Sequence, residues 1–291
     1  MRKINAFLKV LLVLALTAGL AGILVSCAPK EQAEEGEEKE QAAVEKESVV
    51  DTILKRGSMK VGVGIFTPWS FKDKDGNLVG FEVDVATKVA KDMGVEVEFV
   101  PTEWSGIIPA LLTGKFDVII GGMTITPQRA LQVNFTRPYD YANQDMVANR
   151  KITDNGSWKS IEDFNKPDVI IAVRMGSTAK ETAAIVFPKA TLREFDDEGQ
   201  VIQEVLNGKA HAVVSSAPKP FHWLSQYPDT LYRPFEGESL RKEPIGFALR
   251  KDDFNGLTFF NSWIQINWDT GWLQSKHDYW FETMEWQKFL E

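Results

Sequence analysis

The stretch from residue 116 to residue 139 constrains the fold of this chain more than any other. Residues 116–120 are an apolar run rich in β-branched side chains and too short for a typical helix, so they predict a buried strand. Gly121-Gly122 follows, and a glycine pair lets another group come close to the backbone. Thr126 and Pro127 have the order of a helix N-cap and a first helical residue, which predicts a short helix over 127–133.

Arg129 falls in the first turn of that helix, where its positive charge opposes the helix dipole. A negatively charged partner would compensate it. The partner could be an anion held by Arg129, the Thr124 hydroxyl and nearby backbone N–H groups. It could equally be the carboxylate of a neighbouring acidic side chain. The spacing alone leaves both interpretations open.

The same stretch resembles a known family signature. TITPQR at 124–129 and NFTRPY at 134–139 are similar to the T-x-T-x-x-R and F-[ST]-x-P-Y motifs of family 3 periplasmic solute-binding proteins. The resemblance extends with compatible spacing from about Val50 to the C-terminus. It implies an α/β fold of two lobes, the type II periplasmic-binding-protein fold, closing on a small polar ligand. It also implies that Arg129 grips the α-carboxylate of that ligand.

Predicted strands and helices alternate along most of the chain from Ser58, which favours mostly parallel sheets with ligands outside the carboxyl ends of the strands. We expect lobe 1 to comprise 50–142 and 243–291 and lobe 2 to comprise 143–242, with hinge strands near 141–146 and 239–244. Residues 111–122 and 205–216 echo each other as a helix end, a Gly-Lys turn and an apolar strand. Five tryptophans in the helical tail are expected to pack in the core.

The resemblance also implies further contacts with the ligand. Ser177 and Thr178, in the G-S-T motif, would face Arg129 and contact the same carboxylate, although simple helix capping also explains them. Phe66 and Trp104 would sandwich the ligand, and such an aromatic pair can also hold a cation. The predicted ligand-binding residues are Phe66, Trp104, Gly122, Thr124, Arg129, Ser177, Thr178 and Ser216.

The chain departs from the family pattern at Ser216. Amino-acid binders of the family usually carry an aspartate there, which pairs with the ligand's ammonium, and a neutral hydroxyl cannot supply that ion pair. The ligand is therefore expected either to lack a free α-ammonium or to find another acid, such as Glu103 or Asp145.

A second departure concerns cyclohexadienyl dehydratase, an enzyme that shares this fold. Its general acid is a glutamate two places after the threonine of the G-x-T motif. Here that position is Lys180, with Glu181 next to it. A lysine lacks the required acid chemistry at neutral pH, so the resemblance favours a binding protein, and no catalytic residue is expected.

The N-terminus has the features of an export signal. A basic start and an apolar stretch over 10–25 predict a secretory signal within 1–27, and it ends in LVSC, which resembles a bacterial lipobox. We expect lipidation at Cys27, the only cysteine, although an unpaired cysteine in an ordinary signal is the alternative. The acidic, aromatic-free stretch 28–49 is expected to be a disordered tether. Removing the signal's three basic residues changes the net charge from −8 to about −11, and nothing indicates nucleic-acid binding.

The sequence thus predicts a monomeric substrate-binding lipoprotein of an ABC importer, outside the cytoplasm and anchored by lipid in the periplasm or at the cell surface. Its ligand would be a small carboxylate-bearing solute, an amino acid or a derivative, and its partner a permease in the membrane. No metal or cofactor is expected. A dehydratase-like enzyme and a binder of a non-amino organic acid are the alternatives, and a sensor domain is a weaker one.

Overall fold

The computed structural model describes residues 47–283 and 285–290. The predicted signal, Cys27 and nearly all of the predicted tether therefore lie outside the described residues. Helix α1 (Val49–Arg56) begins at the last residue assigned to the tether. Ser48 caps it by accepting a hydrogen bond from the backbone N–H of Val50, and Gly57 ends it in the left-handed conformation with φ 75°.

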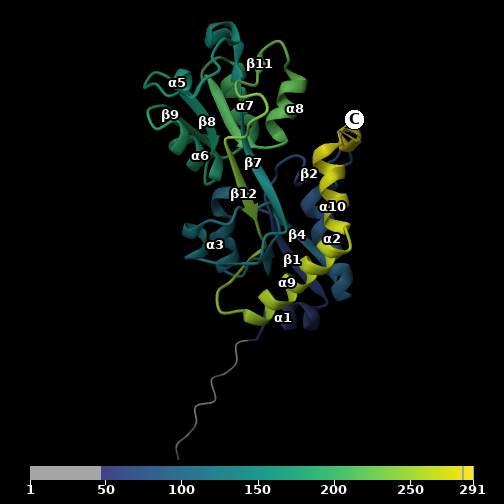
Figure 1. The fold of residues 1–291 in the computed structure, drawn as a ribbon. Coiled ribbons are helices and arrows are strands. Elements are labelled where there is room, and N and C mark those ends of the chain that lie inside the picture. The colour runs from purple at the N-terminus through teal and green to yellow at the C-terminus, as the bar shows by residue number, and fades with distance from the viewer. Residues whose placement is uncertain (1–46, 284, 291) are drawn as a thin grey trace, which may run out of the picture. The chain divides into compact units, whose positions relative to one another are not determined.

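The described residues form two α/β lobes, each built around one mixed sheet (Figure 1). The first sheet has the strand order β4-β1-β5-β13-β6. Its elements and those that cover it are β1 (Ser58–Val63), β2 (Phe71–Lys72), β3 (Leu78–Val79), α2 (Phe81–Met93), β4 (Glu96–Pro101), η1 (Trp104–Gly106), α3 (Ile107–Leu112), β5 (Val118–Ile119), α4 (Pro127–Ala130), β6 (Asn134–Phe135), β13 (Ala248–Leu249), α9 (Phe254–Asp269), α10 (Trp272–His277), η4 (Asp278–Glu282) and η5 (Glu285–Phe289).

The second sheet has the order β11-β7-β10-β8-β9, with β12 paired to β7. Its elements are β7 (Asp140–Asn149), η2 (Arg150–Ile152), η3 (Asp154–Gly156), α5 (Ile161–Phe164), β8 (Ile170–Arg174), α6 (Thr178–Val186), β9 (Thr191–Phe195), α7 (Glu198–Leu206), β10 (Ala212–Ser216), α8 (Lys219–Gln226), β11 (Leu231–Tyr232) and β12 (Arg241–Ile245).

The expectation of mostly parallel sheets is wrong in detail. Strand β1 runs parallel to β4 and β5, and β8 runs parallel to β9 and β10. Strand β7, however, is antiparallel to β10, β11 and β12, and β13 is antiparallel to β5 and β6. The path of the chain explains the pairing of β7 and β12: β7 leads out of the first lobe and β12 leads back, so these two strands run antiparallel to each other. Figure 1 shows β7 and β12 next to each other where the chain passes between the two lobes.

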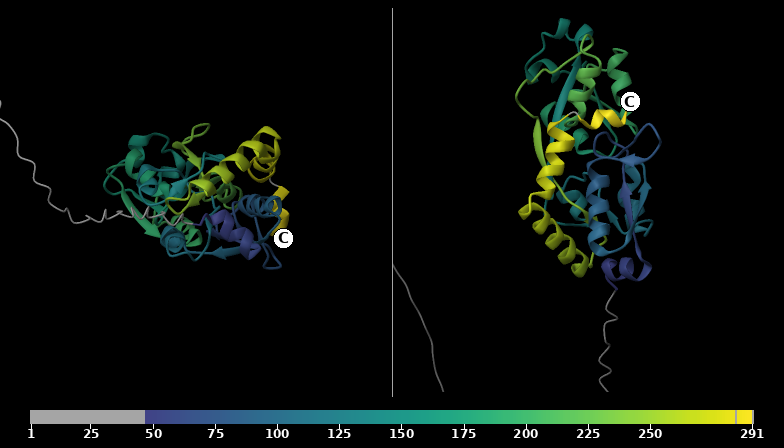
Figure 2. Two further views of the ribbon diagram at one scale, coloured as in Figure 1. Left: turned by 90° about the horizontal axis from the view of Figure 1, so that it is seen from below. Right: turned by 90° about the vertical axis from the view of Figure 1, so that its right-hand side faces the viewer.

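Periodic apolar residues place the helices. Phe81, Val85, Val89 and Ala90 of α2 are buried against the first sheet, as their spacing predicts, and the opposite face of the helix carries charge. The C-terminal tail, yellow in Figure 2, runs along the first lobe. Its five tryptophans pack against the core as expected. Three of them are buried and two lie partly buried against the same core: Trp263, Trp280 and Trp286, then Trp268 and Trp272.

In the described part of the chain, no helix is both long enough and apolar enough to cross a lipid bilayer.

Candidate functional site

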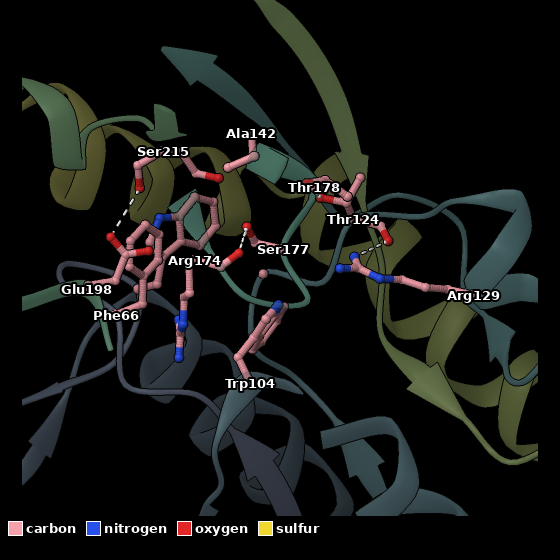
Figure 3. A pocket seen from close by; sticks show the side chains of 15 residues that line it. Phe66, Trp104, Thr124, Arg129, Ala142, Arg174, Ser177, Thr178, Glu198 and Ser215 are labelled. Atoms are coloured by element: carbon pink, nitrogen blue, oxygen red, sulfur yellow. Dashed lines mark hydrogen bonds between the residues drawn. The ribbon is translucent and has the colours of Figure 1, made fainter. Parts of the chain in front are cut away.

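One pocket collects the residues that the sequence singled out. It encloses about 500 Å³, including its open mouth, and is lined by loops of the first lobe and by strand ends and helix starts of the second (Figure 3). All eight predicted ligand-binding residues line it. The complete lining, with predicted and unpredicted residues together, is Phe66, Trp69, Trp104, Gly121, Gly122, Thr124, Arg129, Ala142, Arg174, Ser177, Thr178, Ala179, Glu198, Ser215 and Ser216.

Arg129 is held where two lobes meet. Thr126 caps α4 by accepting the backbone N–H of Arg129 at 3.2 Å, which fixes the start of the helix. The guanidinium is buried, with 8% of the residue exposed. Its Nη1 donates to the Thr124 carbonyl at 2.9 Å and its Nη2 to the Gly176 carbonyl of the second lobe at 3.0 Å. Burial lowers the pKa of Arg129, and the charges of Glu181 and Glu243 oppose that shift.

The helix that carries Arg129 is shorter than predicted. It ends at Ala130, where 127–133 was expected; residues 131–132 form a turn, in which the N–H of Gln132 donates to the Arg129 carbonyl three residues back, before the chain enters β6. Among the described residues, no acidic side chain forms a salt bridge with Arg129, and backbone carbonyls accept hydrogen bonds from two of its nitrogens.

The hydroxyls of Thr124 and Thr178 meet across the lobes at 3.1 Å. Both donate to Oε2 of Glu243 on β12, the Thr124 bond being 2.9 Å long. Gln144 on β7 donates to the same oxygen at 3.0 Å and to the Ser216 hydroxyl at 2.9 Å. Sequence reasoning missed Glu243 and Gln144, because their positions on the hinge strands carry no local motif.

The aromatic side chains divide into two groups. Trp69 is 3% exposed and packs edge-on against Phe81, so it belongs to the core while one side of it reaches the pocket. Phe66 and Trp104 are only partly buried. The guanidinium carbons of Arg129 and Arg174 lie 6.0 and 5.5 Å from the Trp104 ring centroid, which is cation–π distance.

Gly122 forms part of the pocket floor. It has φ 67°, and a side chain there would meet Trp69 at 3.1 Å and Glu82 at 3.5 Å. Its N–H donates to the Tyr139 hydroxyl at 3.1 Å, and that hydroxyl donates to the fully buried Glu82 at 2.7 Å. Burial raises the pKa of Glu82 to about 8, so this carboxyl is protonated near neutral pH.

Two charged residues in the pocket were not predicted. Arg174, at the end of β8, is 7% exposed, and its Nε donates to the Asp196 carbonyl at 3.3 Å. Glu198 is the first residue of α7, and its Oε2 accepts from the Ser215 hydroxyl at 3.4 Å. Burial lowers the pKa of Arg174 and raises that of Glu198, and each charge partly offsets the shift of the other. The sequence around them, G-S-T shortly after Arg174 and two aspartates just before Glu198, gave no sign that these side chains point into the pocket.

The acids considered as substitutes for the missing aspartate lie elsewhere. Asp145 is 1% exposed and pairs with Arg233, Oδ2 to Nη2 at 2.6 Å, outside the pocket lining. Glu103 is exposed and does not line the pocket either. Lys180 pairs with Glu194 at 2.8 Å on the outside of the second lobe, so it too is absent from the lining.

Comparison with known proteins identifies relatives over most of the chain. The sequence model of the bacterial extracellular solute-binding proteins, family 3, matches residues 59–283. The L-cystine-binding protein TcyJ of Escherichia coli K12 is 29% identical over 236 residues, which cover 81% of this chain and 86% of that protein. Cyclohexadienyl dehydratase of Pseudomonas aeruginosa PAO1 is 24% identical over 242 residues, 81% of this chain and 87% of the enzyme.

Solved structures show the same similarity. The ancestral amino acid-binding protein AncCDT-1, described as a precursor of cyclohexadienyl dehydratase, is 41% identical with a TM-score of 0.72, over 81% of this chain and all of that one. A second structure of AncCDT-1, described as an ancestral cationic amino acid solute binding protein, gives a TM-score of 0.63 over 80% of this chain and 100% of that one.

Proposed function

The chain belongs to the bacterial extracellular solute-binding proteins of family 3, and we propose that it captures an amino acid between its two lobes for an ABC importer. Its fold is the type II periplasmic-binding-protein fold, as predicted from the sequence. The observation that carries the proposal is the meeting of two sequence motifs from different lobes in one pocket. Arg129 of TITPQR donates to the carbonyl of Gly176, which opens the G-S-T motif.

The proposed anion subsite consists of Arg129 and the start of α6. A guanidinium has five N–H donors in a planar fork, and two of its nitrogens already hold carbonyls in this structure. The remaining donors can bind a carboxylate, assisted by Ser177 and by the N–H groups at the start of α6. A ligand bound there contacts both lobes at once, so its binding energy favours the closed arrangement of the lobes.

The aromatic walls complete the proposed site. Phe66 and Trp104 come from the first lobe and flank the pocket. They would cover the apolar part of an amino acid and exclude water from the ion pair, which strengthens it. Gly122 also lines the pocket, and because it has no side chain it would let the ligand approach its backbone.

Export and anchoring are part of the proposal. The basic and apolar start of the chain and the LVSC sequence at 24–27 support cleavage before Cys27 and lipidation of its thiol. The acidic stretch that follows would act as a tether between the membrane and the binding lobes. The protein would then work as a monomer outside the cytoplasm, delivering its ligand to a membrane permease.

We propose that the protein binds without catalysis. Lys180, at the place of the dehydratase acid, is turned toward Glu194 on the outside of the lobe. The alternative is kept open by the dehydratase relative and by one carboxyl in the pocket, Glu198, whose pKa is raised. Incubation with prephenate and arogenate decides between them: no aromatic product should form, whereas turnover lost in Glu198→Gln or Glu181→Gln would establish an enzyme.

A thermal-shift screen tests the proposed function. The mature chain from Cys27 onward, with alanine replacing the cysteine, is unfolded with amino acids, acylated amino acids, dicarboxylates, sulfonates and betaines. A ligand that binds only the folded state raises the midpoint by mass action. At least one amino acid should raise it in a concentration-dependent way. A shift produced only by solutes without a carboxylate would refute the proposal.

A further inference from the structure

The carboxylate of Glu198 lines the pocket and makes little contribution to holding the fold together. Asp197, the residue before it, caps α7 by accepting the N–H groups of Gly199 and Gln200 at 2.7 and 3.2 Å. The helix start therefore needs no cap from Glu198. Its one hydrogen bond among the described residues is from the Ser215 hydroxyl, and at 3.4 Å that bond is long. A carboxylate has about four acceptor sites, so most of them are free.

The cations near Glu198 are engaged elsewhere. Arg174, on β8, directs its guanidinium to the Trp104 ring at 5.5 Å and its Nε to a backbone carbonyl. Lys219, on α8, lies with its Nζ 5.5 Å from the centroid of the Trp223 ring. Both affect the charge of Glu198 from a distance, and neither forms a salt bridge with it in the described part of the chain. The carboxylate is thus partly desolvated in the pocket wall and has no close counter-ion among the described residues.

Glu198 lies in the part of the pocket away from Arg129. In Figure 3, Glu198 and Ser215 lie at one side of the pocket beside Phe66, and Arg129 and Thr124 lie at the other. Ser215 adjoins Ser216, where the family pattern has an aspartate. Glu198 reaches the pocket from the start of α7, the helix before β10, so the pocket contains a carboxylate although Ser216 on β10 is neutral.

We infer that Glu198 binds a positively charged group of the ligand, an ammonium or a guanidinium, at the opposite end of the pocket from Arg129. This inference rests on the proposed function and narrows it: the ligand is an amino acid whose side-chain cation faces Glu198, with the Phe66 ring beside that cation. Anion and cation are then held by different lobes, Arg129 in the first and Glu198 in the second. The ligand itself completes the charge pairing of the closed pocket.

Calorimetry with matched probes tests the inference. Wild type and Glu198→Gln are titrated with L-arginine, with its neutral analogue L-citrulline, and with Nα-acetyl-L-arginine. Wild type should bind arginine, and the variant should lose about 10- to 100-fold in affinity for it, the range expected for a hydrogen bond to a charged group. The preference of wild type for arginine over citrulline should disappear in the variant. The preference over the acetylated form should remain, because the α-ammonium is bonded to the same carbon as the carboxylate and therefore lies at the Arg129 end of the pocket.

Two further variants serve as controls for this experiment. Glu194→Gln removes a carboxylate of the same lobe that pairs with Lys180 outside the pocket, and it should leave both preferences unchanged. Glu198→Asp keeps the charge on a shorter arm and should retain the selectivity at lower affinity, which a purely structural role would not produce. Unfolding midpoints without ligand confirm that each variant is folded.

Two outcomes overturn the inference, and they differ. Wild type that binds arginine with an affinity unchanged in Glu198→Gln shows that the cation lies elsewhere, while amino-acid binding stands. Wild type that binds none of these probes but binds a dicarboxylate refutes both the inference and the proposed amino-acid ligand.

Discussion

Replacing Arg129 should abolish most of the affinity for the ligand. The side chain is 8% exposed, and its position depends on Thr126, which caps α4. Two carbonyls, from Thr124 and Gly176, hold the guanidinium at 2.9 and 3.0 Å and so orient it before any ligand arrives. A pre-oriented charge loses little conformational entropy on binding.

The magnitude follows from burial and charge. Truncating one partner of a buried, hydrogen-bonded charge pair costs about 2–5 kcal/mol of binding free energy. At about 1.4 kcal/mol for each tenfold change, Arg129→Ala should weaken binding roughly 30-fold to several thousand-fold. Arg129→Lys should recover little, because an ammonium cannot hold two carbonyls and grip a carboxylate in one plane.

Calorimetry measures the affinities, and Arg250→Ala is the matched control. Arg250 also donates to two backbone carbonyls, those of Leu111 and Phe116 at 3.2 and 2.8 Å, but it does not line the pocket. The control should lose stability without losing affinity. An Arg129→Ala protein that binds as tightly as wild type would refute the reasoning, because the carboxylate would then be anchored elsewhere.

Three smaller predictions concern other parts of the chain. Folding raises the pKa of Glu82 from 4.5 to about 8, so its contribution to stability is complete below pH 4.5 and is lost as the pH rises toward 8; the free energy of unfolding should fall by about 1.4 kcal/mol per pH unit in that window. In Glu82→Gln, which still accepts from the Tyr139 hydroxyl, denaturant titrations at several pH values should show no such slope. Cys27→Ser should prevent lipid labelling and release the protein from the membrane fraction, and continued labelling would exclude lipidation at this residue. Ser216→Asp should raise the affinity for a ligand with a free α-ammonium on the order of tenfold, because Gln144, which donates to Ser216 at 2.9 Å, can support the new carboxylate; weaker binding in calorimetry would mean that no ammonium lies there.

The parts of the fold that depend on local patterns were predictable. The echo between 111–122 and 205–216 appears as two helix–turn–strand units, α3 to β5 and α7 to β10. Their turn glycines, Gly114 and Gly208, both have positive φ, 76° and 69°. Only glycine adopts this conformation at little cost, so the sequence marks the turn. The directions of β7 and β13 carry no such mark, since they depend on where the chain crosses between lobes.

The candidate site likewise contains residues that local sequence patterns predicted and residues that they did not. The eight predicted residues meet in one pocket because motifs at strand ends and helix starts have a fixed local geometry. Glu198 and Arg174 escaped prediction for a physical reason. Acidic residues at a helix start are common because they interact well with the helix dipole, and Asp196, Asp197 and Glu198 look alike in sequence. Only the tertiary structure shows that Asp197 caps the helix and Glu198 reaches the pocket.

The most direct test of the account is a crystal structure of the protein with a bound amino acid. The account predicts that the ligand carboxylate lies within hydrogen-bond distance of the Arg129 guanidinium and of the backbone at the start of α6. A carboxylate bound instead to Arg174, with Arg129 still donating only to the Thr124 and Gly176 carbonyls, would contradict it.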